Sequence, residues 1–265
     1  MFDNPRSLLD QITLSHGPHD VLGQYFVMAD EIARESGVRL RLRADFGAFM
    51  DLNRENRDTW HPLPPIYDPA HSNLRIDTAF WLDGVDDRGE TVVTYFARLF
   101  DFTDSNLVDE LRSLRVFYEN PLPRVAAGES VTIDHPRSLT HVRGRTTYGG
   151  GMWVRRDWRG CGFPKYISRI CSAYAHTRWN CAFSWGFVVP RAHRLGLSRA
   201  YGPYDAVEGV TLKIGLGKDL PMMLLWMNNQ TMLADLARQL DRAPIHDSGQ
   251  GYPHDEQVIA RTGPR

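Results

Sequence analysis

The glycine-rich turn at residues 159–164 carries the clearest chemical signal in the chain. It reads Arg-Gly-Cys-Gly-Phe-Pro and stands between a strand-like and a helix-like segment within residues 149–177. Such a turn presents unpaired backbone N–H groups at the N-terminus of a helix, where the helix dipole is positive. This arrangement binds phosphate or pyrophosphate groups. We therefore expect an anionic ligand at this turn.

Positive charge is concentrated around the same turn. Residues 137–169 contain seven arginines and one lysine but a single acidic residue, Asp157. The cluster is compatible with a solvated surface or with an anion site. The whole chain has 31 basic and 32 acidic residues and a net charge of −1, which gives no indication of nucleic-acid binding.

The composition predicts one large globular domain. The chain has 265 residues, 42% of them hydrophobic, which is enough for a substantial core. No basic segment with an apolar stretch opens the sequence, and the apolar run at residues 222–227 is too short to span a membrane. The three cysteines form no CxxC pair, and His16 and His19 have no ligand-like neighbours. We expect a cytoplasmic protein with free thiols and no metal site.

The hydrophobic patterns predict helices and strands in mixed order around one central sheet. Helices are predicted at residues 19–37, 106–118, 164–177, 191–199 and 232–240. Strands are predicted at residues 38–42, 78–82, 91–99, 131–133, 146–154, 181–189, 211–216 and 221–227, the last of which is also compatible with a helix. The strands at 78–82 and 91–99 are expected to form a hairpin, the Pro-rich residues 61–69 a loop, and residues 241–265 a polar tail.

Residues 146–201 resemble the acyl-CoA-binding core of the GCN5-related N-acyltransferases (GNAT). In that family a Q/R-x-x-G-x-G/A turn joins a strand to a helix and holds the pyrophosphate of coenzyme A. Arg159 and Gly162 match its first two fixed positions, and Pro164 stands where Gly or Ala is usual. Proline has no N–H, so one donor is missing, but the N–H groups of Gly160, Cys161, Gly162, Phe163 and Lys165 remain for the phosphates.

The resemblance implies a fold and a binding site. The fold would be α/β (α+β), with a GNAT-like mixed, splayed central β-sheet flanked by helices. Residues 1–265 would form a single domain with an N-terminal helical extension and a core at about residues 38–240. Acetyl-CoA or another acyl-CoA would be the acyl donor, bound by Arg159, Gly160, Cys161, Gly162, Phe163 and Lys165, with Met152 and Val154 beside the pantetheine.

Two further segments bear on the site. The glycines at residues 149–151 favour either a close backbone approach or a β-bulge. Arg155 and Arg156 are expected to face opposite sides of a strand, so that only one can contact the phosphates.

Downstream, residues 192–201 are similar to the family's A-x-x-L-Y-x-x-x-G-F segment, but Gly196 replaces the tyrosine that commonly protonates the departing thiolate. The candidate catalytic groups are therefore Tyr148, His193 and Tyr201, with His141 and Glu129 farther away. Each also has an ordinary structural role open to it: Tyr148 and Tyr201 as packed aromatic side chains and His193 as a solvated helix cap.

We expect an acyl-CoA-dependent N-acyltransferase that moves an acetyl or longer acyl group directly to the amine of a small molecule. Residues 97–103 also resemble a segment of the acyl-homoserine-lactone synthases, which would imply longer acyl thioesters and an acyl carrier protein as donor. A non-catalytic acyl-CoA-binding protein is the other alternative, and a homodimer is compatible with each. Trp60, Tyr67, Phe80, Trp81 and Phe96 are expected either to line an acceptor pocket or to form ordinary core.

Overall fold

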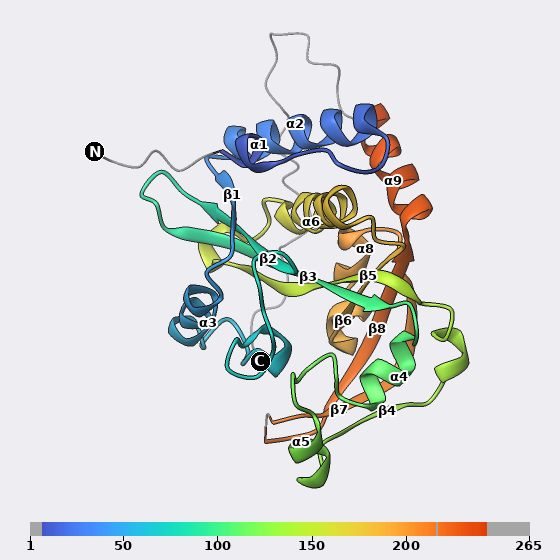
Figure 1. Cartoon of the computed structure of the whole chain (residues 1–265). Helices are drawn as coiled ribbons and strands as arrows, with labels where there is room; N and C mark the ends of the chain where they lie inside the picture. Colours follow the sequence, from blue (N-terminus) through green and yellow to red (C-terminus); the bar gives the residue numbers. More distant parts are fainter. Residues whose placement is uncertain (1–6, 216, 243–265) are drawn as a thin grey trace.

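A single eight-stranded sheet organises the computed structural model, which describes residues 7–215 and 217–242 (Figure 1). The strand order is β1-β2-β3-β5-β6-β8-β7-β4. All neighbouring strands are antiparallel except β5 and β6, which are parallel, so the sheet is mixed. The strands are β1 (Arg39–Arg43), β2 (Ala79–Val85), β3 (Thr91–Phe102), β4 (Ser130–Ile133), β5 (Gly144–Val154), β6 (Phe183–Val188), β7 (Asp205–Lys213) and β8 (Leu220–Asn228).

Helices cover both faces of the sheet. The sheet separates the core into two large clusters, one on each face. The first face, called here the α6 face, carries α1 (Leu8–Gln11), α2 (His19–Glu35), α6 (Phe163–Trp179) and α9 (Asn229–Arg242). The second face, called here the α3 face, carries α3 (Phe46–Glu55) and α4 (Leu107–Arg112). The expected α/β class, with a mixed central sheet flanked by helices, is confirmed.

Local sequence signals explain several of these elements. In the β2–β3 hairpin, the Asp86 carboxylate accepts hydrogen bonds from the N–H groups of Arg88 and Glu90, and Gly89 supplies a positive φ of 82°. Helix α6 begins after Gly162 and ends before Asn180, both of which have left-handed backbone conformations. The predicted hairpin and the predicted helix at residues 164–177 are thereby confirmed.

Strands β5 and β6 are paired over a short length only. Their register covers Thr146, Thr147 and Tyr148 on β5, after which the two strands separate. Immediately beyond the last pair, a Cβ at Gly186 would overlap the carbonyl oxygen of Gly149, so the two backbones nearly touch where they part. The sheet is therefore splayed at this place.

A β-bulge lies on β5 at the same level. Phe96 on β3 pairs with Gly150 and Thr94 pairs with Trp153, so two β5 residues oppose Tyr95 alone. Gly151 has a φ of 64°, and a Cβ at any of the three glycines would clash with an aromatic side chain. The β-bulge expected at residues 149–151 is confirmed.

Several predicted elements have different limits in the structure. The helix predicted at residues 106–118 ends at Arg112, because Leu114 adopts a left-handed φ of 61°. The helix predicted at residues 191–199 is two helices, α7 (Pro190–Arg194) and α8 (Leu197–Tyr201), separated by Gly196 with a φ of 79°. The strand predicted to start at residue 211 starts at Asp205. Helix α3 was not predicted.

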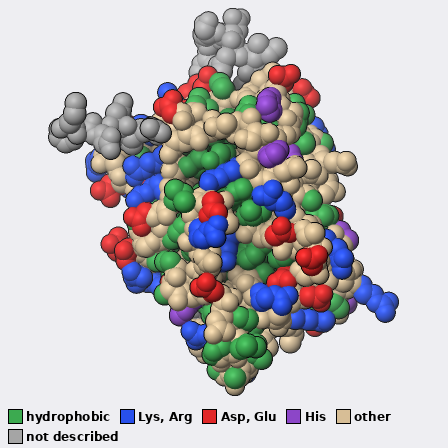
Figure 2. Space-filling model, viewed as in Figure 1, with side chains coloured by type: hydrophobic (Ala, Val, Ile, Leu, Met, Phe, Trp, Pro, Cys, Tyr) green, Lys and Arg blue, Asp and Glu red, His purple; other side chains and the backbone are tan. Residues whose placement is uncertain are grey.

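The surface in the view of Figure 2 mixes both signs of charge, and hydrophobic side chains gather at its lower tip over α5 (Leu122–Ala126). Leu122 and Val125 of this helix are 75% and 48% exposed. Within residues 7–215 and 217–242, no helix combines the length and the apolarity that crossing a bilayer requires. The polar tail predicted at residues 241–265 lies outside the described residues from position 243 onward.

Candidate acyl-donor and acceptor site

A cavity of about 1000 Å³ opens where β5 and β6 separate. Its lining includes Met152 and Val154, which pack on the α6 face, and Tyr148 and Trp153, which belong to the α3 face. The cavity therefore reaches both faces of the sheet through the splay. Its walls come from residues 59–67, Tyr95 of β3, β5 with the turn at 158–164 that follows it, residues 185–204 around α7 and α8, and residues 212–225 of the β7–β8 hairpin.

The predicted anion-binding turn forms one end of this cavity. Arg159, Gly160, Cys161, Gly162 and Pro164 all line it. Gly160 and Gly162 have φ values of 93° and 74°, and no atom lies within 4 Å of a Cβ built on either. No side chain caps the first turn of α6 at Gly162, so the positive end of a 17-residue helix faces open space. This end of the cavity fits a phosphate group.

Two residues of the expected donor site, Phe163 and Lys165, make structural contacts instead. Phe163 is 2% exposed and packs against the ring of Trp158, which anchors the start of α6. The N–H of Lys165 donates to the carbonyl of Gly162 at 3.0 Å, so the expectation that it stays available for the phosphates was wrong. The Lys165 ammonium lies near the ring of Tyr166 and does not line the cavity.

The two arginines at residues 155 and 156 lie beyond the end of β5, so strand alternation does not decide their direction. Arg155 donates to Asp86 at 2.9 Å and to Asp157 at 2.8 Å. Arg156 is exposed and does not line the cavity. Arg159 does line it, and its Nε donates to the Val154 carbonyl at 3.2 Å, which holds the side chain beside β5.

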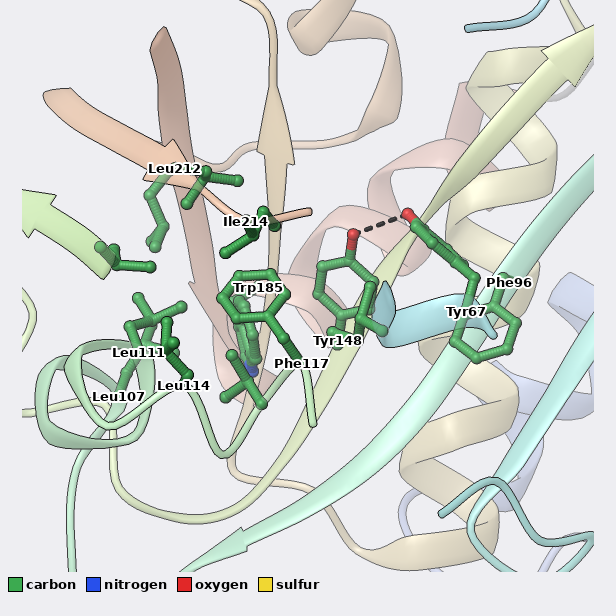
Figure 3. Close-up of a cluster of buried hydrophobic side chains, with 14 of the residues drawn as sticks. Tyr67, Phe96, Leu107, Leu111, Leu114, Phe117, Tyr148, Trp185, Leu212 and Ile214 are labelled. Carbon is green, nitrogen blue, oxygen red and sulfur yellow. Dashed lines mark hydrogen bonds between the residues drawn. The ribbon is translucent and has the colours of Figure 1, made fainter. Parts of the chain in front are cut away.

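Tyr148 lies in the cavity wall next to a second tyrosine. Its hydroxyl is 2.6 Å from the hydroxyl of Tyr67, as the dashed line in Figure 3 marks. Both hydroxyl groups lie close to Gly150. Burial raises the pKa of Tyr148, and burial together with the neighbouring Tyr148 hydroxyl raises the pKa of Tyr67. Both phenols are therefore protonated at neutral pH and can donate hydrogen bonds.

Tyr201 lines the cavity from the other side of the splay, together with Tyr95 and Tyr204. Its backbone position is fixed because its carbonyl accepts a hydrogen bond from Ser168 Oγ of α6 at 2.8 Å. Burial raises the pKa of Tyr201, so this phenol is also protonated at neutral pH.

The remaining acid–base candidates lie away from the cavity lining. His193 is on α7, and its Nδ1 is 2.8 Å from Ser198 Oγ. His141 packs its ring against Phe183 and Trp226, and Glu129 accepts a hydrogen bond from Tyr118. In the part of the chain that the structure describes, no three His, Cys, Asp or Glu side chains are grouped as metal ligands.

Other cavity residues escaped the sequence analysis. His61, Lys218 and Arg191 line the cavity from segments that are distant in sequence from the glycine turn. Of the five aromatic residues expected to line a pocket or form core, Trp60 and Tyr67 line the cavity, whereas Phe80, Trp81 and Phe96 are buried outside it. The Pro-rich composition of residues 61–69 predicted a loop but not its position over the cavity.

Comparisons with known proteins give similarities of structure only. No protein-family profile matches the chain, and no curated protein matches it. The chain is similar to Arabidopsis thaliana NAA60 in complex with acetyl-CoA, with a TM-score of 0.45, 15% identity and coverage of 73% of this chain and 99% of that one.

Two other solved structures are similar at the same level. The aminoglycoside acetyltransferase AAC(6')-Ib in complex with coenzyme A and kanamycin has a TM-score of 0.40 and 13% identity, covering 73% of this chain and 96% of that one. A spermidine N-acetyltransferase chimera from Vibrio cholerae and hSSAT has a TM-score of 0.40 and 12% identity, covering 73% of this chain and 98% of that one. With TM-scores below 0.5, these likenesses assign neither a reaction nor a site residue to this chain.

Proposed function

We propose that this chain is an acyl-CoA-dependent N-acyltransferase of the GNAT type, which moves an acyl group directly to the amine of a small molecule. The observation that carries the proposal is the cavity through the splay between β5 and β6. An uncapped helix N-terminus lies at one end, and hydroxyl groups line the middle. The sequence resemblance of residues 146–201 supports the same function.

The donor fits the α6 end of the cavity. The backbone of Gly160, Cys161 and Gly162 would hold the pyrophosphate, with the guanidinium of Arg159 beside it. Met152 and Val154 would flank the pantetheine arm on the α6 face. The thioester would then reach the splay, where β6 no longer pairs with β5. Acyl-CoA supplies an activated carbonyl whose C–S bond breaks when an amine attacks.

The chain's own groups would assist this transfer. Backbone N–H groups of the splayed β5 segment can donate to the thioester carbonyl oxygen. The protonated tyrosines Tyr148 and Tyr201 can donate a hydrogen bond to the departing sulfur, which finally takes the proton lost by the amine. His61 at the cavity rim can carry that proton away from the amine.

The expected alternative, a longer acyl group, also has a physical basis. The α3 side of the cavity is lined by Trp185, Phe187, Leu212 and Met222, which offer an apolar surface larger than an acetyl group needs. Turnover of acetyl-CoA compared with octanoyl-CoA decides between the two acyl lengths.

Coenzyme A binding tests the proposal directly. In the double variant Arg159→Glu and Gly162→Asp, two negative charges face the proposed phosphate position, so calorimetric affinity for coenzyme A should fall at least about tenfold, the effect of roughly 1.4 kcal/mol. The matched control is Arg156→Glu with Gly128→Asp. Arg156 is outside the cavity, and Gly128 has a similar φ of 83° with open space around it.

The control variant should bind coenzyme A as the wild type does, and both variants should keep the wild-type circular dichroism spectrum. Equal coenzyme A affinity in the two variants would refute the proposed donor site.

A further inference from the structure

The charges on the cavity wall are all of one sign. Four Arg and Lys side chains line the cavity: Arg159, Arg191, Arg194 and Lys218. No Asp or Glu is among the lining residues that the structure describes, although the chain contains 32 acidic residues. Within those same residues, none of the four cations forms an ion pair. The Arg and Lys side chains of the cavity wall therefore have no acidic partner there.

Three of these cations belong to the elements that flank the α6 end of the cavity. Arg159 precedes α6, and Arg191 and Arg194 belong to α7, which follows directly after β6. Phosphate groups of acyl-CoA can neutralise them. Lys218 is different because it lies in the turn between β7 and β8.

That hairpin turn belongs to the α3 face. Gly215, in this turn, lies near Pro65. Pro65 belongs to the same loop as the cavity residues Pro64 and Tyr67. In Figure 1 the free end of the β7–β8 hairpin projects away from α6 and toward the loops below the sheet. Lys218 is thus on the acceptor side of the splay, where donor phosphates are not expected.

Nearby carboxylates do not neutralise Lys218. Asp219 and Asp58 are neighbours of lining residues, but neither lines the cavity itself. Glu129 lies near Gly215, yet it already accepts a hydrogen bond from Tyr118 and lies 3.7 Å from Arg124. The acceptor side therefore offers an uncompensated positive charge.

The rest of the acceptor side is apolar and aromatic. Trp60 and Trp153 stack with ring centroids 5.5 Å apart. Leu63, Leu220 and Met222 also line the cavity. An acceptor that fills this space needs an apolar body, because polar groups without partners are costly to bury there.

We infer that the acceptor is an amine that also carries an anionic group and an apolar body, as an aromatic or aliphatic amino acid does. This inference rests on the proposed N-acyltransferase function. The carboxylate would lie near Lys218 and the side chain against Trp60 and Trp153. A polyamine would bring further ammonium groups into a cavity without a single carboxylate.

The positive wall would also favour the reaction itself. Nearby like charges lower the pKa of an ammonium group, so a larger fraction of the acceptor would be a neutral amine able to attack. The new N–C bond forms, the C–S bond breaks, and the amine proton ends on the thiol. The acceptor carboxylate is unchanged throughout.

The test compares ligands that differ by one group. Phenylalanine and 2-phenylethylamine share the amine and the ring, but only the first has a carboxylate. Binding of these two and of leucine, tryptophan and spermidine would be measured by ligand-detected NMR, with and without coenzyme A. Phenylalanine should bind several-fold more tightly than 2-phenylethylamine, and spermidine should bind most weakly.

A pair of lysine variants locates the effect. Lys218→Gln should reduce the preference for phenylalanine by about two- to fivefold, as expected for one exposed ion pair. Lys213→Gln changes the same charge at an exposed position outside the cavity and should leave the preference intact.

Three results would overturn the inference: no binding of any of the three amino acids, equal or tighter binding of 2-phenylethylamine or spermidine, or an unchanged preference in Lys218→Gln. Coenzyme A binding by the wild-type protein is measured separately. If the wild-type protein does not bind coenzyme A, the result contradicts the proposed function and not this inference.

Discussion

The contact between the backbones of β5 and β6 makes Gly186 a sensitive position. A Cβ at residue 186 would lie closer than 3.0 Å to the carbonyl oxygen of Gly149, a separation that real Cβ atoms essentially never show. The clashing atom belongs to the backbone, so no side-chain rotation relieves it. In Gly186→Ala, β5 must move away from β6 next to their last pair, Tyr148 and Trp185.

The size of the effect follows from what that movement breaks. Losing one or two ladder hydrogen bonds costs about 0.5–1.5 kcal/mol each. Strain from an extra methyl group in a packed place adds about 1–3 kcal/mol. We therefore expect Gly186→Ala to lower the free energy of unfolding by about 1.5–6 kcal/mol, a large part of the roughly 5–15 kcal/mol typical of a folded domain.

Equilibrium unfolding in urea, followed by tryptophan fluorescence and circular dichroism, measures this loss. Gly23→Ala is the matched control because Gly23 lies inside α2 and a Cβ there would be 3.6 Å from Leu14, an ordinary contact. The control should be more stable than the wild type by about 0.5–1 kcal/mol. If Gly186→Ala stays within about 0.5 kcal/mol of the wild type, the strands are not in contact as described.

Three further predictions concern charges and thiols. Asp235→Ala leaves the buried Arg169 without the carboxylate that it contacts at 2.6 Å. Urea unfolding should therefore show that the free energy of unfolding falls by about 3–5 kcal/mol. The control Asp157→Ala, at an exposed ion pair, should lower it by less than about 1 kcal/mol. Burial holds the pKa of His176 below its usual 6.5, so the unfolded chain binds more protons than the folded one. The free energy of unfolding should therefore fall as pH decreases below about 6.5. His176→Gln should flatten this pH dependence. A thiol reagent should modify the exposed Cys161 in the folded protein and all three cysteines only after unfolding, and coenzyme A should protect Cys161.

Each of these has a contrary outcome. Equal losses for the two Asp variants would show that the Arg169 pair is not buried in solution. An unaltered pH profile in His176→Gln would show that another group causes the acid sensitivity. Rapid modification of a second thiol in the folded protein would contradict the burial that raises the pKa of Cys171 and raises that of Cys181 to about 11.

Much of the fold could be predicted because its signals are local. The Asp86–Gly89 turn and the apolar pattern around it specify the β2–β3 hairpin, and the glycine turn specifies the start of α6. The left-handed conformation at Leu114 could not be predicted, because nothing in the helical periodicity of residues 106–118 marks it. Helix α3 is capped by the Asp45 side chain, a signal that was present but was not used.

The site could be predicted in part for a related reason. Tyr148, Met152, Val154, Arg159 and Tyr201 lie at the cavity because one strand–turn–helix unit and its continuation carry them. The other side of the cavity depends on long-range packing, which places a Pro-rich loop and the β7–β8 turn together. Sequence spacing contains no information about that contact.

The bulge on β5 sets the distance between the anion-binding turn and the splay, and it does not change which face the later β5 side chains occupy. Gly150 and Gly151 both face the α3 face, and beyond them Met152 and Val154 face α6 while Trp153 faces α3. Removing Gly151 would restore simple alternation and leave every later side chain on its present face. It would, however, shorten the strand by about 3.3 Å and draw the α6 turn toward the splay by that amount. The extra glycine thus acts as a spacer that sets how far the anion-binding turn stands from the hydroxyl groups of Tyr67 and Tyr148.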